Sequence, residues 1–96
     1  MSYSLIIRKR AEKHIADAYT WYEEQRNDLG EEFLLCVEAS LNTIAENPLL
    51  FQVKHKNIRC IMTPRFPYGV FYFIDNNTIV VIAVFHLSRN PRLWRK

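Results

Sequence analysis

The sequence holds few of the residues that mark metal sites and disulfide frameworks. Only two of its 96 residues are cysteine, Cys36 and Cys60, and only two are glycine. The cysteines have no Cys-x-x-Cys spacing and no cluster of histidines beside them, so the sequence predicts neither a metal site nor a cofactor. Both cysteines are expected to be buried thiols rather than partners in a disulfide.

Long hydrophobic runs are also absent. The first ten residues contain one short apolar run, Leu5-Ile6-Ile7, which is followed directly by three cations. This pattern fits neither a secretory signal nor a membrane span. We therefore expect a cytoplasmic protein that does not act at a membrane.

Acidic residues are scarce in one half of the chain. Residues 1–50 hold five Lys and Arg against nine Asp and Glu, a balance of −4, whereas residues 51–96 hold eight against one, a balance of +7. The two halves sum to the net charge of +3. A basic C-terminal half indicates an acidic protein or a nucleic acid as partner, and its alternative is a solvated basic edge.

Apolar residues, in contrast, are plentiful. Hydrophobic residues make up 49% of the chain and aromatic residues 14%, which is enough for one core. Two domains would each be too small at this length, so residues 1–96 are expected to form a single domain.

The first half of the chain predicts a strand followed by two helices. Alternating apolar residues favour a strand over residues 3–8. Apolar spacings of three and four then predict an amphipathic helix from Ala11 to near Asn27, and a second one that Asn47-Pro48 ends. Asp28-Leu29-Gly30 is expected to connect the two, with Gly30 supplying the unusual backbone angles.

The second half predicts three strands, over residues 58–63, 68–75 and 78–86, with Asn76-Asn77 as a two-residue hairpin turn. The expected fold is α+β: a strand, a two-helix hairpin and a three-stranded antiparallel meander, with both helices packed on one face of the sheet. The opposite face is then left uncovered.

Two loops join the second helix to the meander. Leu49-Leu50-Phe51 is apolar and is expected to plug the end of the helical hairpin. Lys54-His55-Lys56-Asn57 is expected to be a polar turn before the next strand.

Several short motifs occur together in a distinctive order. They are Ala11 with Ile15 and Trp21-Tyr22, Leu29-Gly30-x-x-Phe33, Asn47-Pro48, Arg59, Arg65-Phe66-Pro67-Tyr68 with Tyr72, and His86-x-x-Arg89-x-Pro91-x-x-Trp94-Arg95. In this order and spacing the chain resembles, from end to end, the RelE/ParE family of toxins from type II toxin-antitoxin systems, also called plasmid stabilisation proteins.

The resemblance implies a toxin that a cognate antitoxin neutralises, as a homodimer or a toxin-antitoxin heterotetramer. The antitoxin's C-terminal segment would fold as it wraps the toxin. The expected antitoxin contacts are Trp21, Tyr22 and His14, with a partly exposed Trp21 as anchor. Alternatively, Trp21 is an ordinary core residue at the edge of the hairpin, and His14 and His55 simply face solvent.

Two activities occur among the proteins that the chain resembles. ParE-like members poison DNA gyrase, whereas RelE-like members cleave messenger RNA on the ribosome without metal. RNA cleavage needs a base, an acid and fixed cations. His86 would transfer protons, since its reference pKa is about 6.5, and Arg65 and Arg89 would be the catalytic cations, with Lys54 and Lys56 as further candidates.

Two departures favour the ParE-like branch. RNA-cleaving members generally carry an arginine where this chain has Gly69, and often a tyrosine where it has Trp94, a residue that cannot act as acid or base. The resemblance then implies a gyrase-binding set: Arg59, Arg65, Tyr68, His86, Arg89, Trp94 and Arg95.

Several of these residues also have a simpler explanation. His86 would then only cap the last strand through hydrogen bonds, and Trp94 would only cover the end of the sheet. Arg59 and Arg65 are suited to a charged sheet edge that resists aggregation. Tyr68 and Tyr72 alternate on one strand face and are expected to pack in the core. A third reading of the whole chain is a non-toxic interaction module on the same fold.

Overall fold

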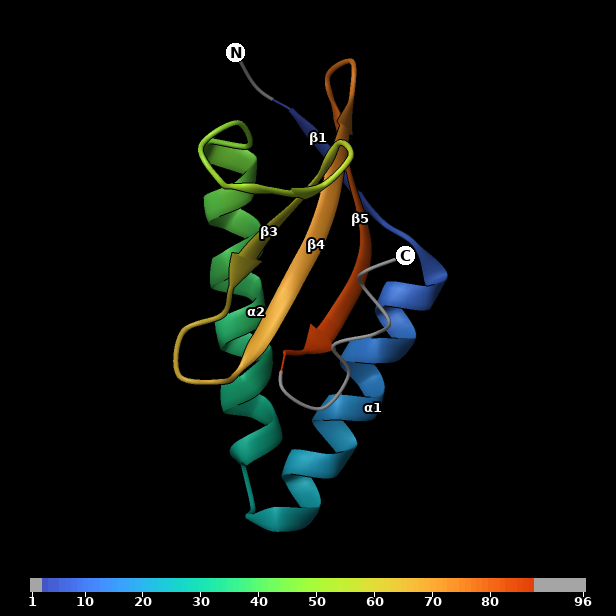
Figure 1. Ribbon diagram of the computed structural model, residues 1–96. Helices are drawn as coiled ribbons and strands as arrows, with labels where there is room; N and C mark the ends of the chain where they lie inside the picture. The colour runs from blue at the N-terminus through green and yellow to red at the C-terminus, as the bar shows by residue number, and fades with distance from the viewer. Residues whose placement is uncertain (1–2, 88–96) are drawn as a thin grey trace.

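The computed structural model describes residues 3–87, which fold into two helices and one five-stranded sheet (Figure 1). The elements follow in the order β1 (Ser4–Ile7), α1 (Lys9–Gln25), α2 (Leu29–Glu46), β2 (Val53–His55), β3 (Ile58–Met62), β4 (Tyr68–Asp75) and β5 (Thr78–His86). The predicted α+β fold, the helical hairpin and the three-stranded meander are confirmed.

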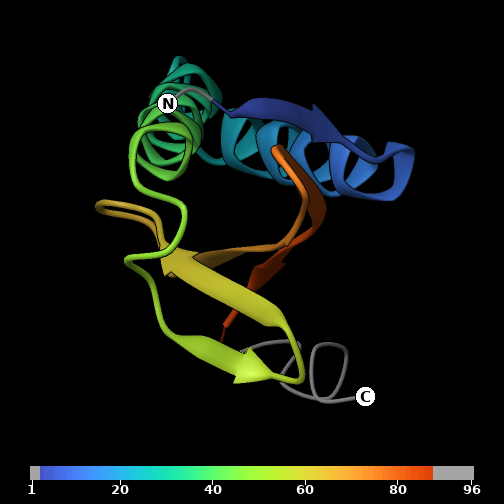
Figure 2. The same ribbon diagram turned by 90° about the horizontal axis from the view of Figure 1, so that it is seen from above.

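The sheet has the strand order β1-β5-β4-β3-β2. Strands β3, β4 and β5 pair antiparallel, and β1 lies parallel to β5, with Ser4 opposite Thr78 and Ile7 opposite Val81. The helical hairpin carries the chain from β1 across to the far side of the sheet. Figure 2 shows both helices on one side, while the hairpin of β2 and β3 curves away from them.

The main core lies between the helices and the sheet. Its buried side chains come from both helices, the β3–β4 turn, β4 and β5: Ala11, Ala18, Tyr22, Phe33, Val37, Ile44, Phe66, Tyr68, Val70, Tyr72, Ile79, Val81 and Val84. The helical members recur at the spacing of the predicted stripes, and the β4 members alternate along the strand. Tyr68 and Tyr72 are therefore core residues, as one of their predicted explanations requires.

One strand was not predicted. Residues 53–55 form β2 and pair with β3, and only Lys56-Asn57 turn, so the predicted polar turn over residues 54–57 is wrong in its first half. Strand β2 is short and carries polar residues, as is common for an edge strand whose side chains are mostly exposed. The pairing with β3 is a tertiary contact that local composition does not encode.

The connection between the helices also differs from the prediction. Asp28, with φ of 69°, takes the left-handed conformation, whereas Gly30 has a negative φ and lies inside α2. Gly30 is needed for space instead, because a Cβ atom there would lie 2.8 Å from the ring and the carbonyl oxygen of Tyr19. Glu23 binds the turn by accepting hydrogen bonds from the backbone N–H groups of Asp28 and Gly30.

The apolar loop after α2 does not act as a plug. Leu49 and Leu50 are exposed, and only Phe51 packs against the core. Hydrogen bonds hold this loop in place: Arg59 Nη1 donates to the carbonyl oxygens of Leu49, at 3.2 Å, and Phe51, at 2.6 Å. The fully buried Tyr72 donates its hydroxyl to the carbonyl of Pro48 at 2.6 Å.

Candidate functional site

Tyr68 and His86 are neighbours at one end of the sheet, where β4 begins and β5 ends. They pair across β4 and β5, and their rings meet edge to face with centroids 5.2 Å apart. A backbone hydrogen bond of 2.9 Å from Leu87 to Pro67 closes the strands just beyond them. Tyr68 is only 5% exposed, whereas His86 is half-buried, so Tyr68 positions the histidine and His86 is the group that a partner can reach.

An aromatic cluster fixes Tyr68 from the helix side. Its ring centroid lies 5.0 Å from that of Phe33, and Tyr22 and Phe66 complete the cluster, with their own centroids 4.8 Å apart. Edge-to-face contacts of this kind stabilise a single arrangement of rings. The orientation of His86 therefore depends on packing between α1, α2 and the β3–β4 turn.

Arg65 lies in the β3–β4 turn at the same end of the sheet. Its backbone is left-handed, with φ of 69°, and the turn is closed by hydrogen bonds from Thr63 Oγ1 and the Tyr68 N–H to the carbonyl of Phe66. Its guanidinium donates to Glu32 Oε1 at 2.6 Å. This bond, together with a weaker one from Arg26, lowers the pKa of the Glu32 carboxyl and favours its charged form. The negative charge of Glu32 in turn partly neutralises the positive charge of Arg65.

Arg59 is not part of this end. It lies opposite Tyr72, four residues along β4 from Tyr68, which corresponds to about 13 Å. Because β2 covers β3, Arg59 is not on an edge strand either, so its predicted role as an edge charge is wrong. Its hydrogen bonds to the loop after α2 give it a structural role.

Trp21, Tyr22 and His14, the predicted antitoxin contacts, lie in different environments. Trp21 is 44% exposed and meets the buried Tyr22 edge to face, with ring centroids 5.0 Å apart. Trp21 is thus the one that presents an apolar surface, as the antitoxin hypothesis requires. The core explanation for Trp21 does not fit this exposure.

His14 is half-buried and binds the backbone of β5, so it does not simply face solvent. Beyond Ile7 the strand β1 has ended, and the N–H of Val84 donates to His14 Nδ1 at 3.1 Å instead of to a neighbouring strand. The imidazole also packs on the ring of Phe85, with centroids 4.7 Å apart. His14 therefore closes the edge of β5 where β1 no longer covers it.

This role requires a neutral imidazole and predicts a pH-dependent stability. Burial, helped by Arg10 and Lys13 and opposed by Asp17, lowers the pKa of His14 below its ordinary value of 6.5. The unfolded chain then takes up the proton first, so the contribution is full above pH 6.5 and declines as the pH falls through the lower, folded-state pKa.

The variant His14→Gln keeps an acceptor for Val84 but does not titrate. We expect wild-type protein to lose more free energy of unfolding than the variant between about pH 7.5 and about pH 5.5, measured by urea denaturation. The two proteins differ only at position 14, so the contributions of all other groups cancel in the comparison. Equal losses would contradict this role for His14.

The face of the sheet away from the helices has a smaller apolar cluster of its own. Its buried members are Cys60, Phe71, Ala83 and Phe85. Burial raises the pKa of the Cys60 thiol to about 11, with Lys54 acting in the opposite direction. Cys60 is therefore a packing residue rather than a nucleophile, and it forms no disulfide because both cysteines are free.

Arg89, Trp94 and Arg95 lie outside the described residues. Among residues 3–87, no three His, Cys, Asp or Glu side chains lie close enough together to hold a metal ion. Over the same residues, no helix has the length and apolar character needed to cross a membrane.

Sequence reasoning missed Glu32 as a partner of Arg65. The two residues are 33 positions apart, so no local pattern connects them. Sequence reasoning also assigned no role to the cations Arg8 and Arg10. The signal there was a run of three cations between a predicted strand and a predicted helix.

Comparison with known proteins adds a family and a fold. The sequence profile described as "ParE toxin of type II toxin-antitoxin system, parDE" matches residues 5–91. A chain of the chromosomal ParDE TA system from P. aeruginosa is similar in structure, with a TM-score of 0.67 and 13% identity over 88% of this chain and 95% of that chain.

A second similar structure is a chain of the intact E. coli RelBE toxin-antitoxin complex, with a TM-score of 0.59 and 20% identity over 91% of this chain and 99% of that chain. At these identities both likenesses concern the fold. A comparison with curated protein sequences gives no significant match.

Proposed function

Since this chain belongs to the ParE toxin family of type II toxin-antitoxin systems, we propose that it arrests growth by poisoning DNA gyrase and that a cognate antitoxin neutralises it. The observation that carries the choice of target is the packing around Gly69. A Cβ atom there would lie 2.8 Å from Cys60 Sγ and 2.9 Å from Leu87 Cδ2. The arginine that RNA-cleaving relatives carry at this position would require the side chains of Cys60 and Leu87 to move.

The groups at the His86 end also support binding rather than RNA cleavage. Cleavage without metal needs a base, an acid and cations that are not yet committed. Arg65 is held by Glu32, and Tyr68 is buried. Lys54 and Lys56, the further candidates, lie on β2 and in the turn that follows it, away from this end of the sheet. Within residues 3–87, this end therefore offers one predicted proton-transfer group, His86, for two proton transfers.

The proposed target-binding surface is the end of the sheet that carries Arg65 and His86. The side chain of Arg65 is 58% exposed, so it can contact a partner while remaining bound to Glu32. Arg89, Trp94 and Arg95 follow His86 in the sequence and are proposed as further contacts. Arg59 is proposed to contribute only by holding its loop.

The experiment that tests the target is induction of the protein in a growing host, with two readouts from one culture. We expect double-strand breaks and an SOS response, with unchanged 5′ ends of cellular RNA. New codon-phased RNA ends with intact chromosomes would instead indicate an RNA-cleaving toxin. Normal growth with neither change would indicate a non-toxic interaction module.

Trp21 is proposed as an anchor for the antitoxin. Exposed tryptophans that become buried in an interface are frequent hot spots, with a loss of about 2 kcal/mol or more on truncation. We therefore expect Trp21→Ala to weaken the affinity for the cognate antitoxin by about 30-fold. Calorimetric titration measures this affinity.

Thr20→Ala is the matched control, because Thr20 is exposed on the same turn of α1 and bonds only its own helix, at the carbonyl of Ala16. Its affinity should stay within about twofold of wild type. If Trp21→Ala binds the antitoxin as tightly as Thr20→Ala, the anchor lies elsewhere.

A further inference from the structure

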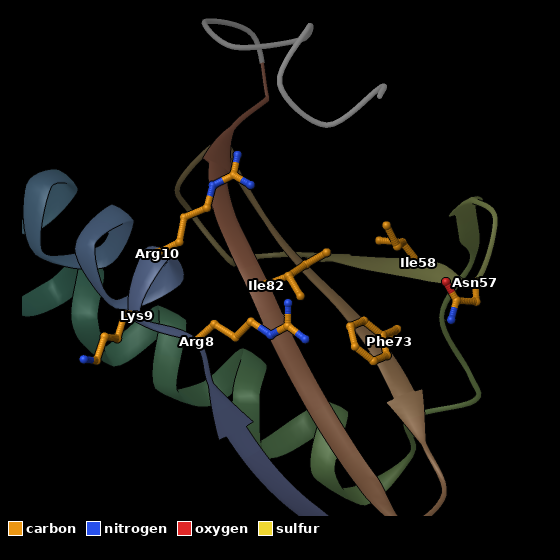
Figure 3. Close-up of a pocket in the computed structure, with 7 residues that line it drawn as sticks. All are labelled: Arg8, Lys9, Arg10, Asn57, Ile58, Phe73 and Ile82. Atoms are coloured by element: carbon orange, nitrogen blue, oxygen red, sulfur yellow. The ribbon is translucent and has the colours of Figure 1, made fainter.

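A pocket of about 610 Å³ lies where the β1–α1 junction meets the sheet, on the face away from the helical hairpin (Figure 3). Its walls come from four places in the chain: Arg8, Lys9, Arg10, Asn57, Ile58, Phe73 and Ile82. Phe73 pairs with Val80 near the β4–β5 turn, so the pocket is separate from the Tyr68–His86 end.

The pocket combines an apolar floor with a cationic wall. In Figure 3 Arg8 and Arg10 extend from the junction across β5 and over Ile82, whereas the amine of Lys9 points the other way. Phe73 and Ile58 continue the floor beyond Ile82.

The two guanidinium groups are held in place by aromatic rings. Arg8 Cζ lies 5.5 Å from the centroid of Phe73, and Arg10 Cζ lies 5.4 Å from that of Phe85. Cation–π contacts fix the guanidinium planes and leave their N–H groups available to an anion. A carboxylate entering the pocket therefore meets donors that are already positioned.

The positive charge at this place is not balanced within the described part of the chain. The ion pairs among residues 3–87 do not include Arg8, Lys9 or Arg10. These cations occupy the N-cap and first turn of α1, where the helix dipole favours negative charge and disfavours theirs. An arrangement that costs stability in the isolated protein is expected where a negatively charged partner binds.

We propose that this pocket binds an acidic peptide segment with an apolar anchor, and that the segment belongs to the antitoxin. The identity of the partner rests on the proposed function, whereas the chemistry of the segment rests on the pocket. An aliphatic side chain covers Ile82 and Ile58, and flanking carboxylates bind Arg8 and Arg10. A peptide is favoured over a nucleic acid because the guanidinium groups already cover the rings on which bases would stack.

The test uses the whole protein and synthetic peptides as probes. A short peptide of alternating Glu and Leu is titrated by calorimetry beside one with Gln for Glu, one with Ser for Leu, and an oligothymidylate. The Glu-Leu peptide should bind about tenfold more tightly than the other two peptides, because each of these lacks one half of the required chemistry. Equal binding of the Glu-Ser peptide would overturn the apolar anchor.

Two double variants with the same change in charge localise the site. Arg8→Gln with Arg10→Gln should weaken binding of the Glu-Leu peptide by about tenfold or more, while Lys13→Gln with Arg26→Gln should change it by less than about twofold. Equal losses of affinity in both double variants would mean that only net charge matters, and would overturn the proposed pocket. The proposal would also be overturned if the oligothymidylate bound more tightly than the Glu-Leu peptide and did so through Arg8 and Arg10.

A milder pair of variants guards against misfolding. Asn57→Asp places a carboxylate on the pocket rim without altering the packing, and Asn27→Asp places one in the turn between the helices. Asn57→Asp should weaken binding of the Glu-Leu peptide by about threefold, whereas Asn27→Asp should leave the affinity unchanged. If neither or both weaken binding, the proposal is wrong.

The two proposals fail separately. If the pocket variants lose peptide binding but the protein has no effect on gyrase, the proposed target is refuted and the proposed peptide site stands. If the protein poisons gyrase but substitutions at Arg8, Arg10 and Asn57 do not change peptide binding, the proposed peptide site is refuted and the proposed target stands.

Discussion

Replacement of Phe33 with alanine is expected to lower the free energy of unfolding by about 3–5 kcal/mol. Phe33 is completely buried in α2 and contacts the rings of Tyr22, Phe66 and Tyr68. Truncation removes the apolar burial of the ring and leaves a cavity at the centre of this aromatic cluster. Small domains have total stabilities of about 5–15 kcal/mol, so urea denaturation should show a large loss.

Leu35→Ala is the matched control for this prediction. Leu35 lies two residues along the same helix but is 64% exposed, so its truncation should change the free energy of unfolding by about 0.5 kcal/mol or less. A similar loss in both variants would mean that α2 does not bury the face that carries Phe33, Val37 and Ile44.

Replacement of His86 with alanine is expected to weaken gyrase poisoning by about tenfold or more, as for a hot-spot residue. His86 is the predicted site residue that is both accessible within residues 3–87 and held in position by a buried ring, that of Tyr68. Purified gyrase and supercoiled DNA measure the effect as the toxin concentration needed for cleavage.

Two further variants distinguish the role of His86. His55→Ala is the control, because His55 lies on β2 opposite Ile58, at the end of β3 away from the β3–β4 turn. It should poison gyrase like wild type. His86→Gln keeps hydrogen-bonding capacity without proton transfer. Partial poisoning by the glutamine variant is expected for a binding residue, whereas a glutamine variant as inactive as alanine would indicate proton transfer.

The sequence was sufficient for elements whose apolar pattern repeats. The stripes that include Ala11, Ala18 and Phe33 predicted both helices, and Asn47-Pro48 marked the end of α2 correctly. Asn76-Asn77 marked the β4–β5 hairpin, whose strands have the predicted bounds, residues 68–75 and 78–86. Such patterns are local, so one chain is enough to read them.

Features that depend on distant partners were not predictable from the sequence. The strand β2 exists because β3 is beside it, and Arg65 is held by a glutamate 33 residues away. Gly30 was noticed correctly as a special position but for the wrong physical reason. The true reason, the approach of Tyr19, requires the packing of one helix on the other.

The candidate site was predicted only in part. The sequence identified His86 and Tyr68, but their pairing depends on a β-bulge at Phe71 and Tyr72, since the two-residue turn alone would place Phe85 opposite Tyr68. The family resemblance grouped Arg59 with them in one gyrase-binding set, yet Arg59 binds a loop at another part of the sheet. Residue type indicates which chemistry is possible, whereas only the fold decides which side chains meet.

The most direct test of the proposed target is a cleavage assay with purified gyrase, relaxed or supercoiled plasmid DNA and the purified protein. Gyrase poisoning predicts that linear DNA accumulates with toxin concentration after protein is removed by detergent and protease, and that it does not accumulate without gyrase. Unchanged plasmid at saturating toxin, in a preparation that still arrests growth on induction, would contradict gyrase as the target.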